Sequence, residues 1–320
     1  MSELNSLLPV LQCPLCKEEK LDFNLNLKRL VCATCAAEYP VVHDIPVLLR
    51  ADNAVFCIED YQRILTPSYG VTTKIGVACF IPSPSINLAS NRLLTRLKNL
   101  LAESATAKVL IVGGGRQRQW LDVALGVSET ISIVYSDIDV SADVDVFCDG
   151  HDLPFVDGCF DAVVTTAVLE HVMYPERVAT EISRVLKIDG LLYSELPFMQ
   201  QVHEGAYDFT RYTLSGHRRL FNRFAEIESG LVAGPATALV WAIENLILAF
   251  LSRPALRKLA KATVRISFFW LKYLDYFLVN RPEAMDGASC TYFLGRKIMA
   301  TVPDTKIISD YIGAKHLSHT

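Results

Sequence analysis

Apolar residues between positions 108 and 198 fall into short runs that alternate with amphipathic stretches. The runs are rich in Val, Ile and Leu and have the length of buried strands, at residues 109–112, 131–135, 144–148, 159–165 and 191–196. Helices are expected between them, one passing through Trp120 and Leu125 and ending at Gly126, another near residues 175–187. This alternation predicts an α/β fold with a doubly wound sheet.

The apolar pattern differs on either side of this segment. Leucines at helical spacing predict an amphipathic helix at about residues 88–102, after a polar and aromatic connector. Two longer apolar stretches, at 238–251 and 256–279, follow the alternating segment. Neither offers the roughly 20 uninterrupted apolar residues that spanning a bilayer requires, so we expect no membrane-spanning helix there.

Composition narrows the class of protein. The chain has 320 residues, of which 51% are hydrophobic, enough for two domains with ordinary cores. The start lacks the pattern of a secretory signal and the nine cysteines are an odd number, so we expect a cytoplasmic protein. A formal net charge of -4 argues mildly against a nucleic acid as the main partner, although it leaves room for a local basic surface.

Two CxxC pairs stand near the amino end, separated by fifteen residues. Each pair brings two thiolates to one point, and together the pairs complete a tetrahedron for Zn²⁺. Four thiolates leave no open coordination position, so the predicted metal is structural. Its expected ligands are Cys13, Cys16, Cys32 and Cys35.

Glycines and acids follow successive expected strands. The first strand runs into three glycines at 113–115, and the next two are followed by Asp137 and Asp139 and by Asp149. The carboxyl ends of parallel strands meet at one edge of a sheet, where ligands bind in α/β folds. A carboxylate suits the two hydroxyl donors of a ribose. The pattern therefore predicts a nucleotide-type cofactor site at this edge.

Five short motifs stand between residues 106 and 198: VLIVGGG at 109–115, DGHDLPF at 149–155, FDAV at 160–163, VLEHV at 168–172 and RVLKIDG at 184–190. Through these motifs, the segment resembles a class I S-adenosylmethionine-dependent methyltransferase of the type-11 group. The resemblance implies a Rossmann-like sheet of seven strands that closes with an antiparallel pair, here at 224–232 and 289–297. A helical insertion at 234–282 then lies before the last strand.

The resemblance also implies which residues contact S-adenosylmethionine. Gly113 and Gly115 would allow the backbone to approach the methionine half, Asp137 would hold the ribose hydroxyls, and Asp149 would face the adenine amine. Asp139 is the alternative ribose ligand. The full expected set is Gly113, Gly114, Gly115, Asp137, Asp149, Gly150 and Leu153, the last packing against the adenine.

The glycine motif departs from the family pattern of acid-x-Gly-x-Gly-x-Gly. Residues 111–117 read IVGGGRQ, so the first acid and the last glycine are missing. Either another residue supplies the function of that acid, or cofactor affinity and turnover are weak. We favour the first explanation.

The end of the CxxC segment resembles the small zinc-ribbon activator proteins that accompany methyltransferases. EYPVV at 38–42 and DIPVLL at 44–49 carry this resemblance, which covers about residues 8–50. The expected organisation is a zinc ribbon at 1–50, a connector and helix at 51–105, a methyltransferase domain at 106–298 and a tail at 299–320.

The acceptor is expected beside residues 197–213, just after the strand at 191–196. This stretch resembles the Pro...His...Asp-Phe-x-Arg-Tyr-Thr segment of methyltransferases associated with polysaccharide and other glycoconjugate pathways. His203 is the candidate general base, with Asp208 as orienter or alternative base and Arg211 as an anchor for an anionic acceptor. Alternatively, Asp208 and Arg211 simply pair with each other. His171 is interpreted as structural or as part of the pocket wall.

The insertion at 234–282 combines aromatic and basic residues. Between Arg253 and Arg281, seven basic residues stand against one acid, Asp275. This composition suits a helix that lies on a membrane surface, which would bring the enzyme to the inner face of the membrane and to a lipid-linked acceptor. A helical lid or a homo-oligomer interface is an equally good interpretation.

Three functions remain open at this point. The leading one is O-methylation of a small-molecule, glycoconjugate or lipid-linked acceptor. An rRNA or tRNA base methyltransferase is an alternative, because some rRNA guanine methyltransferases also carry a zinc ribbon before this fold. However, residues 1–50 hold five basic residues against six acids, which is a poor surface for phosphates. The third possibility is a degenerate cofactor-binding scaffold, suggested by the altered glycine motif.

Overall fold

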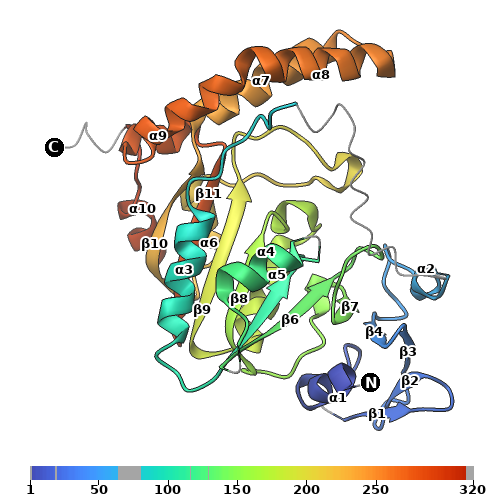
Figure 1. The fold of residues 1–320 in the computed structure, drawn as a ribbon. Coiled ribbons are helices and arrows are strands. Elements are labelled where there is room, and N and C mark those ends of the chain that lie inside the picture. Colours follow the sequence, from blue (N-terminus) through green and yellow to red (C-terminus); the bar gives the residue numbers. More distant parts are fainter. Residues whose placement is uncertain (1, 19, 64–80, 116, 129, 315–320) are drawn as a thin grey trace.

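The computed structural model describes residues 2–18, 20–63, 81–115, 117–128 and 130–314 (Figure 1). Residues 64–80 of the expected connector and 315–320 of the expected tail lie outside this description. The strands of the described residues join into one sheet of eleven, in the order β1-β2-β3-β4-β7-β6-β5-β8-β9-β11-β10.

Seven of these strands form the predicted class I sheet. Five are parallel and two, β10 and β11, pair antiparallel with their neighbours. Their bounds are β5 Ala107–Val112, β6 Ile131–Asp137, β7 Val146–Cys148, β8 Phe160–Thr166, β9 Leu186–Pro197, β10 Phe224–Ala233 and β11 Cys290–Lys297. The predicted α/β fold is confirmed, including the small amino-terminal unit and the helical insertion before the last strand.

Helices cover both faces of this sheet. On β5, Val109 and Ile111 pack with α3 (Ser90–Leu101) and α4 (Arg118–Leu125), while Leu110 and Val112 pack with α5 (Pro175–Val185) on the opposite face. Successive side chains of a strand point to opposite faces, so a strand buried on both sides is apolar throughout. Gly126 ends α4 in the left-handed conformation, with φ of 67°.

Element ends differ from the predictions by a few residues. The helix expected at 175–187 ends at Val185, because Leu186 already pairs with Phe160 as the first residue of β9. The strand expected at 144–148 begins only at Val146. The short elements are α2 Ile58–Gln62, η3 Gly150–Asp152, η4 Leu169–His171, η5 Gly205–Tyr207, α6 Leu214–Leu220, η7 Pro282–Gly287 and α10 Asp304–Ser309.

The amino-terminal ribbon is continuous with the large sheet. Its elements are α1 Ser2–Leu7, η1 Leu8–Val10, β1 Leu21–Asn24, β2 Arg29–Cys32, β3 Glu38–Val42 and β4 Ile45–Leu48. Strand β4 pairs in parallel with β7, with Val47 opposite Phe147 and Leu48 opposite Cys148. Leu11 and Leu30 belong to the same buried cluster as Phe155. The ribbon therefore extends both the sheet and its core.

The insertion forms a helical hairpin above the sheet (Figure 1). It consists of α7 Pro235–Ala249, α8 Pro254–Phe268, η6 Phe269–Leu274 and α9 Asp275–Leu278, and α7 and α8 run across the top of the view. Asp275 is fully buried and accepts hydrogen bonds from the backbone amides of Gly234, Ala236 and Thr237 at the start of α7. Within the described ranges, none of the helices combines the length and apolar character needed to cross a bilayer.

Candidate cofactor and acceptor site

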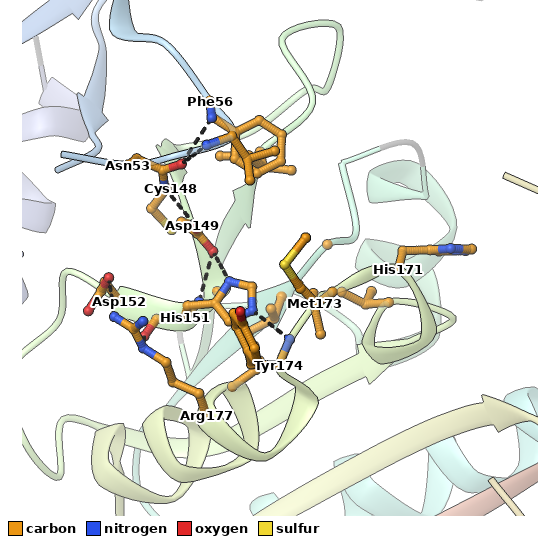
Figure 2. Close-up of a pocket in the computed structure, with 18 of the residues that line it drawn as sticks. Asn53, Phe56, Cys148, Asp149, His151, Asp152, His171, Met173, Tyr174 and Arg177 are labelled. Carbon is orange, nitrogen blue, oxygen red and sulfur yellow. Dashed lines mark hydrogen bonds and ion pairs between the residues drawn. The ribbon is translucent and has the colours of Figure 1, made fainter. Parts of the chain in front are cut away.

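A cavity of about 400 Å³ opens at the carboxyl ends of β5, β6 and β7 (Figure 2). Four of the residues predicted to contact the cofactor line it: Gly113, Asp137, Asp149 and Gly150. The other three do not: Leu153 is fully buried in the core, and Gly114 and Gly115 lie outside the lining. The cavity thus lies at the strand ends where the sequence predicts a nucleotide-type ligand.

Side chains pack closely around the glycine turn at 113–115. Gly113 adopts a φ of 75°, and a Cβ there would collide with Val168. A Cβ at Gly114 would collide with Ile111, which occupies the position of the family's missing acid and is buried under the turn. The apolar Ile111 therefore packs tightly against the turn.

Asp137 ends β6 with its carboxylate held by backbone amides. Its Oδ1 accepts from Ile138 N at 2.7 Å and Asp139 N at 3.0 Å, and its Oδ2 accepts from Gly115 N at 3.3 Å. Burial raises the pKa of Asp137 above its ordinary value despite these bonds. Asp139, the alternative ribose ligand, does not line the cavity. Its Oδ1 accepts hydrogen bonds from the backbone N and the Oγ of Ser141.

Asp149 follows β7 and lies between two donors (Figure 2). Its Oδ1 accepts from His151 through both the backbone N at 2.9 Å and Nδ1 at 2.6 Å, and its Oδ2 accepts from Asn53 Nδ2 at 2.7 Å. Burial opposes ionisation, but the hydrogen bonds from His151 and Asn53 outweigh it and lower the pKa of Asp149. The ionised Asp149 carboxylate can accept a hydrogen bond from a further donor.

Asn53 comes from the segment that follows the ribbon, and the sequence carried no signal for it. Because β4 runs parallel to β7, both strands deliver their next residues to the same edge. Asn53 Oδ1 accepts from the amides of Val55 and Phe56, both at 2.9 Å, so its Nδ2 is the group that faces Asp149. The cavity wall also includes Arg50 and Phe56.

His151 is fixed by a second contact. Its Nε2 accepts from the backbone N of Tyr174 at 3.2 Å, which assigns the ring proton to Nδ1 and to the bond with Asp149. The Arg177 side chain lies next to His151. It donates hydrogen bonds to Asp152 at 2.6 Å and to the His151 carbonyl at 3.0 Å. These residues form one wall of the cavity.

The other end of the cavity is lined by His171, Tyr207 and Phe209. Phe209 N donates to the Glu170 carbonyl at 2.8 Å and so ties the loop after β9 to η4. The predicted catalytic residues His203, Asp208 and Arg211 lie on this loop but do not line the cavity. The His203 ring stands edge-on to His171, with centroids 4.9 Å apart, and 6.5 Å from Trp241 of α7.

Asp208 and Arg211 form hydrogen bonds with each other and with the backbone of the loop that carries them. Arg211 forms two hydrogen bonds to the Asp208 carboxylate and also donates to the carbonyls of Gln200, Gln201 and Thr210. Burial opposes ionisation of Asp208, but the bonds from Arg211 and from His203 N lower its pKa well below the usual range. The alternative interpretation, that this pair is formed, describes the observed contact.

Glu170 is a titratable residue that sequence reasoning missed, although it stands in the quoted VLEHV motif. Its side chain is buried, and neither carboxylate oxygen has a hydrogen-bond partner among the described residues. The His171 Nε2 lies 3.7 Å from its Oε1. Burial raises the pKa of Glu170 to about 7.

The four predicted metal ligands converge in the ribbon. Cys13 Sγ and Cys35 Sγ are 3.7 Å apart, and Cys16 Sγ and Cys32 Sγ are 3.5 Å apart. A tetrahedron of thiolates with metal–sulfur bonds of about 2.3 Å has edges of about 3.8 Å. The cluster fits a zinc ribbon.

Residues 112–194 match the family model described as "Methyltransferase domain". With the sheet order and the cavity described above, this match makes the protein a class I S-adenosylmethionine-dependent methyltransferase.

A second match concerns 57 residues, 18% of this chain. They are 35% identical to the UPF0434 protein PSHAa1659 of Pseudoalteromonas translucida (strain TAC 125) and cover 86% of that protein. Through this segment, the chain belongs to the UPF0434 family.

Several solved structures are similar in fold. Phosphoethanolamine N-methyltransferase 2 of Haemonchus contortus, in complex with S-adenosyl-L-methionine, is 15% identical, covers 76% of this chain and 60% of its own, and has a TM-score of 0.43. A chain from the complex between the Trm112 methyltransferase activator of Haloferax volcanii and a methyltransferase is 19% identical, with coverages of 65% and 91% and a TM-score of 0.41. The [4+2]-cyclase SpnF is 20% identical, with coverages of 64% and 81% and a TM-score of 0.40.

Proposed function

We propose that the protein methylates a hydroxyl oxygen of a small-molecule, glycoconjugate or lipid-linked acceptor. The observation that carries the proposal is the single cavity that has Gly113, Asp137 and Asp149 at one end and His171, Tyr207 and Phe209 at the other. When bound, S-adenosylmethionine supplies a methyl group on a sulfonium. An acceptor hydroxyl would receive this methyl group, S-adenosylhomocysteine would leave, and a residue of the chain would have to take the hydroxyl proton.

Two carboxylates of the chain, those of Asp137 and Asp149, are suited to bind the cofactor. Asp137 is oriented by three backbone amides, which leave one of its roughly four acceptor sites, on Oδ2, for a ribose hydroxyl. Asp149 is kept ionised by its donors and accepts from the adenine amine. Gly113 gives the ligand access to the backbone because it carries no side chain.

We assign the role of proton acceptor to His203, whose ring centroid lies 4.9 Å from that of the cavity-lining His171. The Nδ1 of His203 lies 3.2 Å from the Gln201 carbonyl and 3.5 Å from Asp208 Oδ2, so Nδ1 carries the proton and Nε2 has the free lone pair. Asp208 and Arg211 are positioning residues that hold the loop carrying His203. The donors of Arg211 are used within this loop, which favours this role over direct contact with an anionic acceptor.

Calorimetry with S-adenosylmethionine and S-adenosylhomocysteine tests the cofactor end. We expect binding by the wild type and a loss of roughly 10- to 100-fold in Asp137→Ala, because a hydrogen bond to a charged group disappears. Asp139→Ala is the matched control and should stay within a few-fold of the wild type. Failure of the wild type to bind either ligand would support the scaffold hypothesis, and a larger loss in Asp139→Ala would move the ribose contact to that residue.

The four cysteines are proposed to hold one structural Zn²⁺. The metal would stabilise a ribbon whose apolar core is small and shared with the sheet. No reaction step is assigned to it, since four thiolates fill its coordination sphere.

We further propose that the helical hairpin contacts a membrane surface. Its exposed apolar side chains include Phe250, which is 81% exposed, and Phe277, which is 79% exposed. Four basic residues of the hairpin remain exposed: Arg253, Lys258, Lys261 and Arg281. An exposed apolar surface bordered by cations suits anionic headgroups. Because Trp241 of α7 lies near His203, a lipid-linked acceptor would arrive beside the catalytic loop.

Flotation on anionic vesicles tests this contact. We expect wild-type protein to float and Phe250→Ser/Phe277→Ser to remain with the soluble fraction. Val123→Ser is the control, since Val123 of α4 is 82% exposed outside the hairpin. Wild-type protein that stays soluble contradicts membrane contact. A dimer in light scattering that the double variant converts to a monomer would assign the apolar surface to an interface between copies.

A further inference from the structure

Three side chains at the acceptor end converge in a way that the methyl transfer described above does not use. One ligand atom each from Glu170, His171 and His203 lie within 4.8 Å of one another. Apart from the four cysteines, this is the group in the described ranges with the composition and spacing of a metal site. His171 also lines the cavity, so the group borders the space where the acceptor is expected.

Glu170 supplies an independent reason to expect a ligand. Its side chain is about 1% exposed, and both oxygens lack hydrogen-bond donors in the described part of the chain. A buried carboxylate without partners is costly in free energy. The cost disappears if a cation binds or if the group takes a proton.

Each of the two imidazoles has an acceptor next to its Nδ1. The Nδ1 of His171 lies 2.7 Å from the Tyr207 carbonyl, and the Nδ1 of His203 faces the Gln201 carbonyl and Asp208. Carbonyl oxygens only accept, so each Nδ1 carries the proton and each Nε2 has a lone pair. Hydrogen bonds of this kind hold the far nitrogen of metal-bound histidines and fix their tautomer.

The Nε2 of His171 and the Oε1 of Glu170, 3.7 Å apart, are therefore both acceptors when the carboxyl is ionised. Without a proton or a cation between them, they have no attractive contact. Two imidazoles and a carboxylate form a donor set that suits Zn²⁺ and similar divalent transition metals.

We propose that Glu170, His171 and His203 bind one divalent transition-metal ion beside the acceptor. Three protein ligands leave a position open for the acceptor hydroxyl. Binding to the ion lowers the pKa of that hydroxyl, and its proton leaves to water, so that His203 serves as a ligand in this state and not as the base. The inference concerns the acceptor end of the proposed function, but metal binding is measurable without any methyl transfer.

Counting zinc tests the site in the full chain. After equilibration with Zn²⁺ and removal of free metal, elemental analysis should find two zinc ions per wild-type chain, one in the ribbon and one at this site. We expect one ion per chain in Glu170→Gln and in His203→Gln. Glu204→Gln, a neighbouring exposed acid outside the group, should keep both.

Three outcomes would overturn the site: one zinc ion in the wild type, equal zinc in the wild type and both variants, or the same loss in Glu204→Gln. The first two would assign a proton to Glu170 in place of a metal.

Calorimetry of the same variants with S-adenosylhomocysteine separates the two proposals. Retained binding in Glu170→Gln and His203→Gln shows that these variants fold, so their lost zinc is a property of the site. A wild-type chain that holds two zinc ions but does not bind S-adenosylhomocysteine keeps the metal site and contradicts the proposed methyl transfer.

Discussion

The two ends of the cavity are built differently. At the proposed cofactor end, Asp137 and Asp149 lie at the carboxyl ends of parallel strands, and their carboxylates receive backbone and side-chain donors. At the proposed acceptor end, the cavity is lined by His171, and His203 lies next to it on the loop after β9, near Trp241 of the inserted helix α7. The cofactor end depends on the common features of the sheet, whereas the acceptor end depends on elements specific to this chain.

Two carboxylates of the cavity region also differ in their electrostatics. Donors around Asp149 lower its pKa, whereas Glu170 has no hydrogen-bond donor among the described residues and burial raises its pKa to about 7. Asp149 is suited to accept a hydrogen bond from a neutral group such as an amine. Glu170 is suited to bind a proton or a cation.

The largest expected effect separates the two ends. Asp208→Ala should lower kcat/KM for methyl transfer by about 100-fold, because Arg211 loses its partner and the loop that carries His203 loses its order. Binding of S-adenosylhomocysteine, measured by calorimetry, should change less than about threefold. Glu204→Gln provides the control on the same loop. An equal loss of cofactor binding in Asp208→Ala would contradict the separation.

Removing the ribbon metal should affect the cofactor end. Cys16→Ser/Cys32→Ser should lose one zinc ion and bind S-adenosylhomocysteine roughly 10-fold more weakly, since β4 then no longer fixes the segment that includes Asn53. Elemental analysis and calorimetry give the two readouts. Cys57→Ser, an exposed cysteine outside the cluster, should change neither. Unchanged affinity in the double variant would mean that the cofactor end is complete without the ribbon.

A smaller effect is expected from Asn53 itself. Asn53→Ala removes the bond to Asp149 and frees the amides of Val55 and Phe56, so affinity for S-adenosylhomocysteine should fall about fivefold, or roughly 1 kcal/mol. Asn24→Ala is the matched control, because Asn24 caps a similar turn in the ribbon without a contact to the cavity. Tighter binding by Asn53→Ala would indicate instead that Asn53 competes with the adenine amine.

The smallest effect is a pH dependence within the cofactor end. Cofactor hydroxyls bind the ionised form of Asp137, whose pKa burial raises above 3.8. Affinity should therefore decline as pH falls through this raised pKa, while Asp149, whose pKa is lowered, remains ionised. Calorimetry from pH 7 downward should show a decline of a few-fold that begins at a higher pH than an ordinary aspartate pKa of 3.8 would give. A decline of the same size in Asp137→Asn would assign the titration to another group.

Much of the fold could be predicted from the local pattern of apolar residues. Continuous apolar runs predicted the parallel strands, and these strands are buried on both faces as expected. The observed ends of the elements differ from the predicted ones where strand pairing determines them. Leu186, for example, pairs with Phe160, so α5 ends earlier than predicted. A helix boundary depends on contacts made by residues far away in the sequence, and apolar periodicity does not contain them.

Within the candidate site, sequence patterns located the acids that follow β6 and β7, because the fold brings strand ends to one edge. The same reasoning did not reach Asn53, whose contact with Asp149 joins residues 96 positions apart. It also did not identify Glu170, because an acid in a short motif shows neither its burial nor its lack of donors.

By itself, the sequence determined the strand and helix pattern, the cysteine pairs and the positions of the carboxylates at the strand ends. These features are periodic or local, so hydrophobic spacing and residue chemistry suffice to predict them. Tertiary structure alone decided the pairing of β4 with β7, the position of Asn53 and the convergence of Glu170, His171 and His203. Burial, pKa shifts and ligand geometry arise only when distant segments pack together, which is why these three features required the folded chain.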